Sequence, residues 1–280
     1  MMDKVAVKIA ILQMTSGIDP RENVDAILSA MKEASGQDAA MLFTPEMALM
    51  LDRDGARAAV HIEQETESQW VQKLADGARE HRIWLHIGSA AFAGASSDKK
   101  VNRALVIDDQ GVIRARYDKI HLFDVDLPTG ESWRESASFE GGSEAVAVDT
   151  PWFRLGLSVC YDLRFPDLYR ALSNAGADVL AIPAAFTVPT GSAHWHIMQR
   201  ARAIEAGAYV IAAAQVGTHE DGRATYGHSL VIDPWGEILL DMQDEPGLGF
   251  ATIDPARIAD VRMRLPAINH RRPIGDVRLS

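Results

Sequence analysis

An internal repeat constrains the fold of this chain more than any single motif does. The first half reads as strand, helix, strand, helix, strand and a hairpin-like pair, and the second half repeats that order. The turns recur as well, because residues 106–113 (VIDDQGVI) resemble residues 231–238 (VIDPWGEI). A repeated β-α-β order predicts two pseudo-equivalent α/β halves. The expected strands are 8–13, 39–44, 83–89, 154–159, 178–182 and 209–215, and the expected helices are 20–35, 68–81, 166–174 and 193–205.

Apolar patterning predicts how these halves pack. The helix expected at 20–35 carries apolar residues at i, i+3, i+4 and i+7, so it buries one face only. Residues 179–182 are apolar without alternation, which is typical of a strand covered on both faces. Two sheets, each with helices on one face, can bury their other faces against each other. The sequence therefore predicts an α/β fold, a four-layer α-β-β-α sandwich. Residues 1–280 would form one domain, with the halves meeting near 127–150.

Composition excludes several classes of function. The formal charge of −11, from 28 basic and 39 acidic residues, offers no basic surface for nucleic acid or for an anionic membrane. The N-terminal residues show no basic leader region or cleavage site, and no apolar stretch approaches the roughly 18 residues of a membrane span. We therefore expect a cytoplasmic protein. Cys160 is the single cysteine, which excludes an intrachain disulfide and a Cys-rich metal site.

Two segments differ from the repeated pattern. Residues 93–100 combine Gly, Ser and charged residues and are expected to form an exposed loop. Residues 255–280 carry six arginines against two aspartates, with few signals of regular structure. This extension could contact a second subunit or form a solvated tail, and composition leaves both alternatives open.

Cys160 stands where an α/β protein would place a nucleophile. It follows the strand expected at 154–159 and precedes a helix whose start is indicated by Pro166 and Asp167. Ligands bind at the carboxyl ends of strands in open α/β sheets, and a nearby helix N-terminus favours a thiolate. A buried, inert cysteine is the alternative. The position makes Cys160 a candidate nucleophile.

A catalytic cysteine needs a base or a cation, because a thiol with an ordinary pKa near 8.5 is mostly protonated at neutral pH. Glu46 places a carboxylate at the end of an apolar strand in the first half. Lys119 follows the last strand of that half and could bring an ammonium group between the sheets, although a surface lysine is the alternative. Glu135 lies in the connecting segment and carries no signal by itself.

Taken together, Glu46, Lys119, Glu135 and Cys160 resemble the nitrilase superfamily of carbon-nitrogen hydrolases, which use a Glu-Lys-Cys triad with a supporting Glu. The resemblance covers nearly the whole chain, and residues 119–124 (KIHLFD) and 159–166 (VCYDLRFP) match the Nit-type branch. The spacing agrees too, with 41 residues from Lys119 to Cys160 and 16 from Lys119 to Glu135. The resemblance implies the same four-layer fold and a homodimer. We expect neither a metal nor another cofactor.

The same resemblance implies a role for each residue in hydrolysis of a small amide substrate. Cys160 would attack the amide carbon, with Glu46 as the general base and acid. Lys119 and the backbone N–H of Tyr161 would form the oxyanion hole, and Glu135 would orient Lys119.

Within the branch, three segments look most like deaminated glutathione amidases, which release 2-oxoglutarate and cysteinylglycine: residues 200–205, 212–219 and 226–229. An omega-amidase acting on 2-oxoglutaramate, or a hydrolase of another small amide or carbamoyl compound, is the alternative. Both named substrates carry a carboxylate on the acyl half. We expect it to contact Arg164 and the loop 187–191, through Thr187 and Thr190.

Other readings of the sequence are weaker. A papain-like pair would join Cys160 to His121, His194, His196 or His228, none of which has the local signature. His194 and His196 could suggest a metal, but side chains two residues apart on a helix point apart and no third ligand is evident. Residues 247–249 (GLG) lack the following helix and lysine of a nucleotide site. A non-enzymatic binding protein with a thiol is the remaining alternative.

Overall fold

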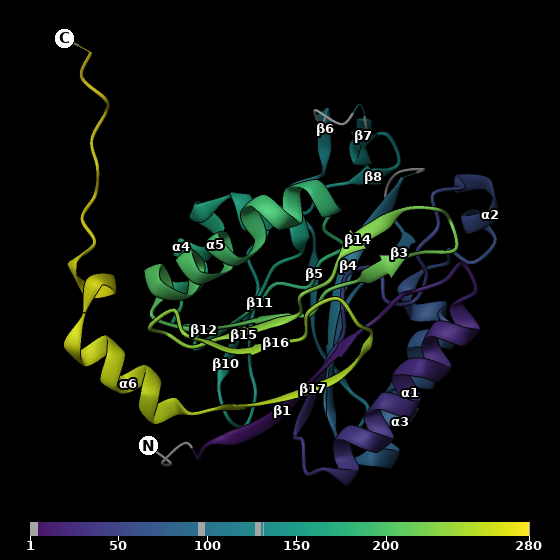
Figure 1. The fold of residues 1–280 in the computed structure, drawn as a ribbon, viewed down its shortest axis with the longest axis horizontal. Helices are drawn as coiled ribbons and strands as arrows, with labels where there is room; N and C mark the ends of the chain where they lie inside the picture. The colour runs from purple at the N-terminus through teal and green to yellow at the C-terminus, as the bar shows by residue number, and fades with distance from the viewer. Residues whose placement is uncertain (1–4, 95–98, 127–129, 131, 280) are drawn as a thin grey trace.

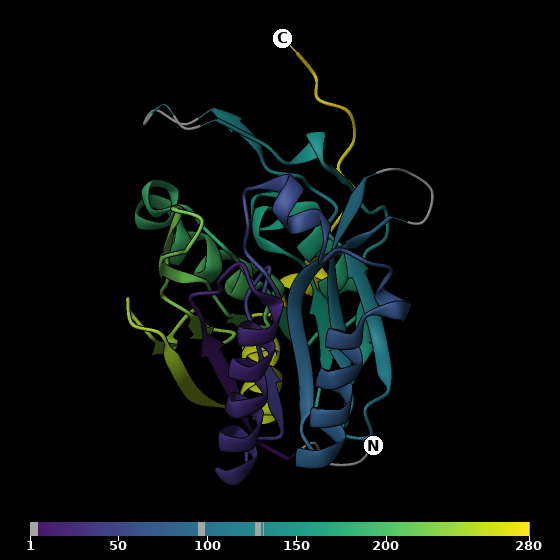
Figure 2. The same ribbon diagram turned by 90° about the vertical axis from the view of Figure 1, so that its right-hand side faces the viewer.

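The computed structural model describes residues 5–94, 99–126, 130 and 132–279. Two β-sheets pack against each other and helices cover their outer faces (Figure 1). Turning the view by 90° shows α1 (Pro20–Gly36) and α3 (Gln69–His81) side by side on the outside of the first sheet (Figure 2). Helices α4 (Pro166–Asn174) and α5 (Val188–Ala206) cover the second sheet. This arrangement confirms the predicted four-layer α-β-β-α sandwich.

Both sheets are mixed, with parallel pairs at the centre and mostly antiparallel pairs outside it. The first has the order β17 (Gly247–Ile253), β1 (Val7–Gln13), β2 (Met41–Phe43), β3 (Trp84–Ala93), β4 (Lys100–Ile107) and β5 (Ile113–Asp118), with β8 (Phe139–Glu140) beside β4. The second has the order β16 (Ile238–Asp241), β15 (Leu230–Ile232), β12 (Tyr209–Ala212), β11 (Val179–Ala181), β10 (Arg154–Leu157) and β9 (Ala147–Asp149). In each sheet, β-α-β crossovers join the parallel strands at the centre.

Smaller elements complete the chain. They are α2 (Gly55–Ala59), α6 (Pro255–Arg264), the strand pairs β6 (Asp124–Asp126) with β7 (Ser132–Arg134) and β13 (Val216–Thr218) with β14 (Ala224–Tyr226), and the 3₁₀ turns η1 (Glu65–Glu67), η2 (Glu135–Ala137), η3 (Cys160–Arg164) and η4 (Ala267–His270). No helix among the described residues is both long enough and apolar enough to cross a membrane.

Strand β1 illustrates why the two sheets need each other. Ile9 and Ile11 belong to the apolar cluster that includes the second sheet, whereas Ala10 and Leu12 belong to the cluster under α1 and α3. Successive side chains of a strand point to opposite faces, so an apolar run places half of its residues in each layer. The absence of alternation in such runs therefore follows from burial on both faces.

The repeated turns are equivalent at the level of single hydrogen bonds. Asp108 Oδ1 accepts from the backbone N–H groups of Gln110 and Val112, at 2.9 and 2.8 Å. Asp233 Oδ1 does the same for residues 235 and 237, also at 2.9 and 2.8 Å. Gly111, with φ 78°, completes the first turn in the left-handed region, where a Cβ would lie 2.6 Å from a backbone oxygen. The predicted recurrence of turn chemistry is confirmed.

The structure departs from the sequence predictions in three places. The last strand, β17, returns to the first sheet and pairs antiparallel with β1, so the two halves are interlocked. Helix α5 begins at Val188, so residues 188–191 of the expected loop 187–191 form its first turn. Residues 255–264 form the helix α6, which the arginine-rich composition did not reveal. Of the expected loop 93–100 and the boundary 127–150, residues 95–98, 127–129 and 131 lie outside the described residues.

Candidate active site

Elements of both halves bring the four predicted catalytic residues together. Glu46 follows β2, Lys119 follows β5, and Cys160 follows β10 at the start of η3. Glu135 begins η2 in the segment that connects the halves. All four line one cavity of about 290 Å³. A larger hollow, about 400 Å³, lies between α4, α5 and α6 and contains none of these side chains.

Lys119 is held between two carboxylates. Its Nζ donates to Glu46 Oε1 at 2.9 Å and to Glu135 Oε2 and Oε1 at 2.9 and 3.1 Å. The Lys119 side chain is only 2% exposed, so these charges meet in a region of low dielectric. The backbone N–H of Phe123 donates to Glu135 Oε2 at 2.7 Å and fixes that carboxylate in turn. The structure therefore brings Glu46, Lys119 and Glu135 into direct contact.

Cys160 occupies a strained turn beside Glu46. Its φ is 49°, in the left-handed region that non-glycine residues rarely adopt, and its N–H donates to the Pro183 carbonyl at 2.8 Å. The interaction between the thiol and the Glu46 carboxylate raises the pKa of Cys160 and lowers that of Glu46. The backbone N–H of Ala185 contacts both partners, donating to Glu46 Oε2 at 2.9 Å and to the sulfur. Cys160 therefore lies beside the Glu46 carboxylate in the cavity.

Electrostatics set the resting protonation of this group. Burial works to raise the pKa of Glu46, but the charge of Lys119 and hydrogen bonds from Cys160, Lys119 and Ala185 outweigh burial and hold that pKa below its ordinary value. Burial works to lower the pKa of Lys119, but the charges of Glu135 and Glu46 raise it well above its ordinary value. The resting pair is thus a carboxylate and an ammonium.

The expectation that a helix N-terminus favours a thiolate at Cys160 is wrong for this resting arrangement. Burial and the Glu46 charge raise the pKa of Cys160 well above its ordinary value, against the smaller opposing effects of Lys119 and the Ala185 N–H. The sulfur is therefore a neutral thiol at neutral pH. A neutral thiol is a weak nucleophile, so attack by this sulfur requires a nearby group that takes its proton.

Two buried residues complete the site and were missed from the sequence. Asn102 donates through Nδ2 to Glu46 Oε1 at 3.0 Å and to Glu135 Oε1 at 3.2 Å, bridging the two carboxylates. Asp162 is fully buried and fixes the turn after Cys160, accepting from Val159 N at 2.9 Å. A polar residue inside an apolar strand was the only available signal for Asn102.

Asp162 also ties this turn to the segment that carries Lys119. It accepts from the Tyr117 hydroxyl at 2.7 Å and from the His121 backbone N–H at 3.0 Å. His121 Nδ1 lies 2.7 Å from the same carboxylate, and its ring stacks on Phe165. His121 is thus bound to Asp162, and the carboxylate beside Cys160 is that of Glu46.

The predicted substrate contacts divide into two groups. Thr187 and Thr190 line the cavity, as does Tyr161, whose backbone was predicted to serve the oxyanion hole. Arg164 is not among the lining residues; its guanidinium packs over Tyr161 and Phe186 and lies 3.3 Å from His194 Nδ1. The cavity geometry does not support the predicted contact of Arg164 with substrate. Cationic side chains that the sequence did not single out line the cavity instead: Arg53, Lys100, Arg134 and Arg223.

The fold and the site together define a cysteine hydrolase, and the chain belongs to the carbon-nitrogen hydrolase family, whose sequence model matches residues 8–263. It is an enzyme of that family, a nitrilase-superfamily amidase with an active-site cysteine.

Individual relatives agree over most of their length. The chain is 38% identical to the deaminated glutathione amidase of Yersinia enterocolitica, over 97% of this chain and 96% of that protein. The crystal structure of the Caenorhabditis elegans NitFhit protein superposes with a TM-score of 0.89 at 38% identity, covering 97% of this chain and 66% of that one. A mutant of the amidase from Nesterenkonia sp. AN1, in which acrylamide has added to the active-site cysteine, superposes with a TM-score of 0.75 at 28% identity, covering 93% and 98% of the two chains.

Proposed function

We propose that this enzyme is a deaminated glutathione amidase that cleaves its substrate into 2-oxoglutarate and cysteinylglycine. The observation that carries the proposal is Lys100, whose cationic side chain lines the cavity that also holds Cys160, whereas the lining residues Arg134 and Arg223 already pair with Asp126 and Asp221. Deaminated glutathione has a carboxylate at each end of its chain, and cationic side chains recognise carboxylates through charge-assisted hydrogen bonds. The names of the relatives at 38 to 41% identity support the same substrate.

Lys100 is the best placed of these cations. It begins β4, two residues before Asn102, so both side chains lie on the same face of the strand. Burial lowers the pKa of Lys100, and its ammonium stands 4.7 Å from the centre of the Phe139 ring. Burial removes part of the water around the Lys100 ammonium, and a bound substrate carboxylate would replace that stabilisation of its charge.

The first half of the reaction forms a thioester. Glu46 takes the proton of Cys160 while Sγ attacks the amide carbon, and Lys119 Nζ with the Tyr161 backbone N–H stabilises the oxyanion. When the tetrahedral intermediate collapses, the carbon–nitrogen bond breaks and Glu46 passes its proton to the leaving amine. Cysteinylglycine departs and the 2-oxoglutaryl group stays on Cys160.

The second half regenerates the enzyme. Glu46 takes a proton from water, whose oxygen attacks the thioester carbon. Collapse breaks the carbon–sulfur bond, and the proton returns to Cys160 as 2-oxoglutarate leaves. In this scheme Glu135 and Asn102 are positioning residues, because they contact Lys119 and Glu46 and not the reacting atoms.

The test compares deaminated glutathione and 2-oxoglutaramate side by side, following 2-oxoglutarate release by the wild type and by Cys160→Ala. A clear preference for deaminated glutathione is expected. A preference for 2-oxoglutaramate would assign the protein as an omega-amidase, and turnover of neither would refute both substrates. Wild-type turnover by Cys160→Ala would refute the thioester mechanism.

Three further expectations belong to this proposal. We propose that residues 1–280 act as a single domain, that the protein is a homodimer and that it works in the cytoplasm. In the described part of the extension, Arg257 pairs with Asp233 at 2.7 Å and Arg262 with Asp178 at 3.2 Å. These contacts attach α6 to its own chain, and Arg271 still donates to Ser173 and Asn174 of α4. Beyond that residue the chain runs away from the body, and we propose that a second subunit contacts it there (Figure 1). Sedimentation of the enzyme with and without residues 272–280, which keeps the contacts of Arg271, tests that role.

A further inference from the structure

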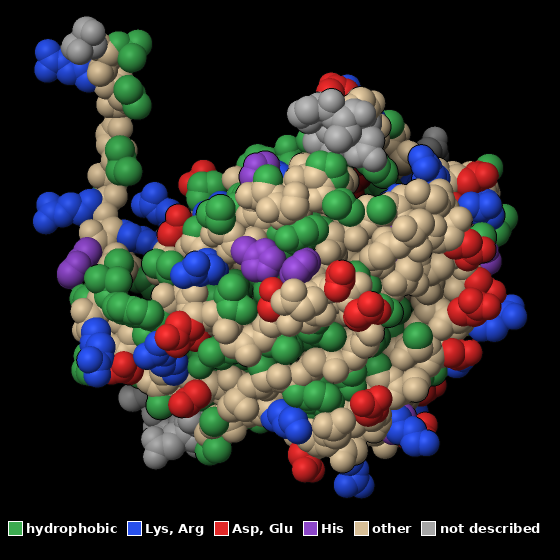
Figure 3. All heavy atoms as spheres, viewed as in Figure 1, with side chains coloured by type: hydrophobic (Ala, Val, Ile, Leu, Met, Phe, Trp, Pro, Cys, Tyr) green, Lys and Arg blue, Asp and Glu red, His purple; other side chains and the backbone are tan. Residues whose placement is uncertain are grey.

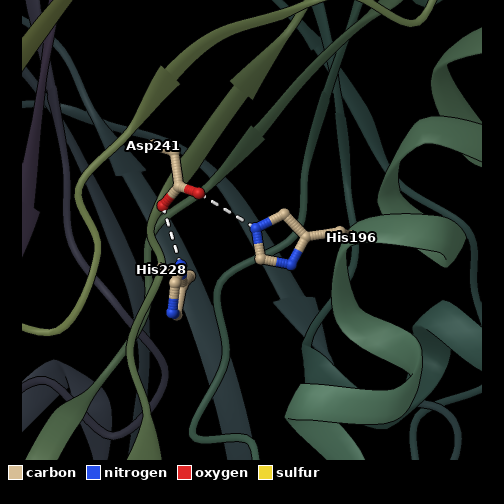
Figure 4. A group of neighbouring side chains, drawn as sticks. All are labelled: His196, His228 and Asp241. Atoms are coloured by element: carbon tan, nitrogen blue, oxygen red, sulfur yellow. Dashed lines mark hydrogen bonds and ion pairs between the residues drawn. The ribbon is translucent and has the colours of Figure 1, made fainter.

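A cluster of two histidines and one aspartate lies outside the catalytic cavity. His196 Nε2 is 3.0 Å from Asp241 Oδ2, and His228 Nδ1 is 2.9 Å from Asp241 Oδ1 (Figure 4). One nitrogen or oxygen of each residue lies within 4.8 Å of the other two. His194, the partner considered for His196 in the sequence, turns away from the cluster to Arg164.

Three separate segments supply these side chains, which converge on one point. His196 lies in the third turn of α5, His228 lies between β14 and β15, and Asp241 ends β16. Their side chains are 30%, 19% and 19% exposed, so an ion from solvent can reach them. Histidine side chains are visible at the surface on this face of the molecule (Figure 3).

The backbone holds His228 firmly in this position. Its φ of 54° lies in the left-handed region, its N–H donates to the Gln243 carbonyl at 2.6 Å, and its carbonyl accepts from Trp195 Nε1 at 2.8 Å. The imidazole stacks on Tyr226 with ring centres 4.5 Å apart. Trp195 is the neighbour of His196, so these contacts also fix the two histidines relative to each other.

We propose that His196, His228 and Asp241 bind a divalent transition-metal ion, with Zn²⁺ as the expected occupant. Two imidazoles and one carboxylate suit Zn²⁺, which takes four ligands at about 2.0–2.2 Å, and water would complete the set. Each imidazole would bind through the nitrogen that now faces Asp241 and carry a proton on the other ring nitrogen. The purely oxygen-seeking ions Mg²⁺ and Ca²⁺ fit this donor set poorly.

The ion would join α5 to the β15–β16 hairpin behind the wall of the catalytic cavity. Trp195 packs on Phe186, which lines that cavity, with ring centres 4.9 Å apart. Thr190, another lining residue, lies in the first turn of the same helix. Binding of Zn²⁺ to the folded state alone would raise the melting temperature, because only the fold assembles the three ligands.

The test uses the untagged full chain carrying Cys160→Ser, which removes the thiol as a competing Zn²⁺ ligand, after chelator treatment and dialysis. Titration calorimetry with ZnCl₂ should give one site per chain. Asp241→Asn and His196→Gln should each weaken it at least about tenfold, whereas His194→Gln, an exposed histidine on the same helix, should not. Circular dichroism of each variant confirms folding.

A second measurement gives a readout of the ligand set itself. CoCl₂ bound by two imidazoles, a carboxylate and water should produce visible absorption bands that Asp241→Asn removes. ZnCl₂ should raise the melting temperature of the parent chain, and MgCl₂ at the same concentration should not. Absence of a saturable site in the parent, or equal loss in His194→Gln, would overturn the proposal.

Discussion

Replacing Glu46 by Gln should separate the reactivity of Cys160 from turnover. The carboxylate now accepts from three donors and interacts with the thiol: Lys119 Nζ donates at 2.9 Å, Asn102 Nδ2 at 3.0 Å and the Ala185 N–H at 2.9 Å. A glutamine keeps the shape but cannot take a proton. Loss of a general acid and base costs about 10²- to 10⁴-fold in rate, or about 3–5 kcal/mol of barrier.

The same substitution should make the thiol more acidic. The Glu46 charge is the second largest cause that raises the pKa of Cys160 after burial, and the charge of Lys119, which lowers it, remains in Glu46→Gln. An amide N–H facing the sulfur would further favour the thiolate. In Glu46→Gln, Cys160 should therefore still be alkylated at neutral pH, although the variant hydrolyses almost no substrate.

Iodoacetamide labelling followed by mass spectrometry, measured from pH 6 to 10 beside 2-oxoglutarate release, tests both statements. Glu135→Gln is the matched control, because it changes the other carboxylate on Lys119 without facing the thiol. Cys160→Ala should not be labelled at that position. The reasoning would be refuted if Glu46→Gln lost labelling and turnover in parallel, or if its labelling required a higher pH than the wild type.

Three other outcomes follow from single contacts. Tyr117→Phe removes a hydrogen bond to the buried Asp162 carboxylate and should cost about 1.5–3 kcal/mol, or about 3–5 °C in melting temperature; a shift below about 1 °C would contradict this. Burial lowers the pKa of His86 to about 3, below the value near 6.5 in the unfolded chain, so its contribution to stability is complete above pH 6.5 and decreases as the pH falls. Urea unfolding at pH 7 and pH 5 should show a loss of about 2 kcal/mol that is absent in His86→Phe, and identical losses would argue against it. Lys100→Gln should raise the KM for deaminated glutathione about tenfold or more, whereas Arg164→Gln should change it less than about twofold, and the reverse ranking would restore the contact predicted for Arg164.

Much of the fold was predictable because its signals are local. Apolar periodicity and the start signals at Pro166 gave the helix 166–174 with the bounds that the structure has. The first turn of α5 was missed because residues 187–191 contain Thr, Pro and Gly, which in sequence read as a loop. In the structure Pro189 occupies an early helical position, where its missing N–H costs nothing.

The residues that support the candidate site were harder to find. Cys160 and Glu46 end apolar strands, and that position is visible in the sequence. Asn102 binds partners 56 and 33 residues away, and Asp162 joins its own turn at Val159 to Tyr117 and His121, so both roles depend on contacts between distant segments. The proposed metal site was equally hard to find in the sequence, because His196, His228 and Asp241 meet only when α5 packs on the second sheet.

The pairing of β17 with β1 has a consequence for how the chain is made. Val7 pairs with Ile253, so the edge of the first sheet stays uncovered until almost all of the chain has left the ribosome. At about 5–20 residues per second, some 240 residues of synthesis take on the order of 10–50 s. An uncovered strand edge recruits other strands, so during that interval the nascent chain is exposed to aggregation and to chaperones. In a chain that ends before β17, the edge of β1 would stay uncovered permanently. Completion of the first sheet therefore depends on one of the last strands to be synthesised.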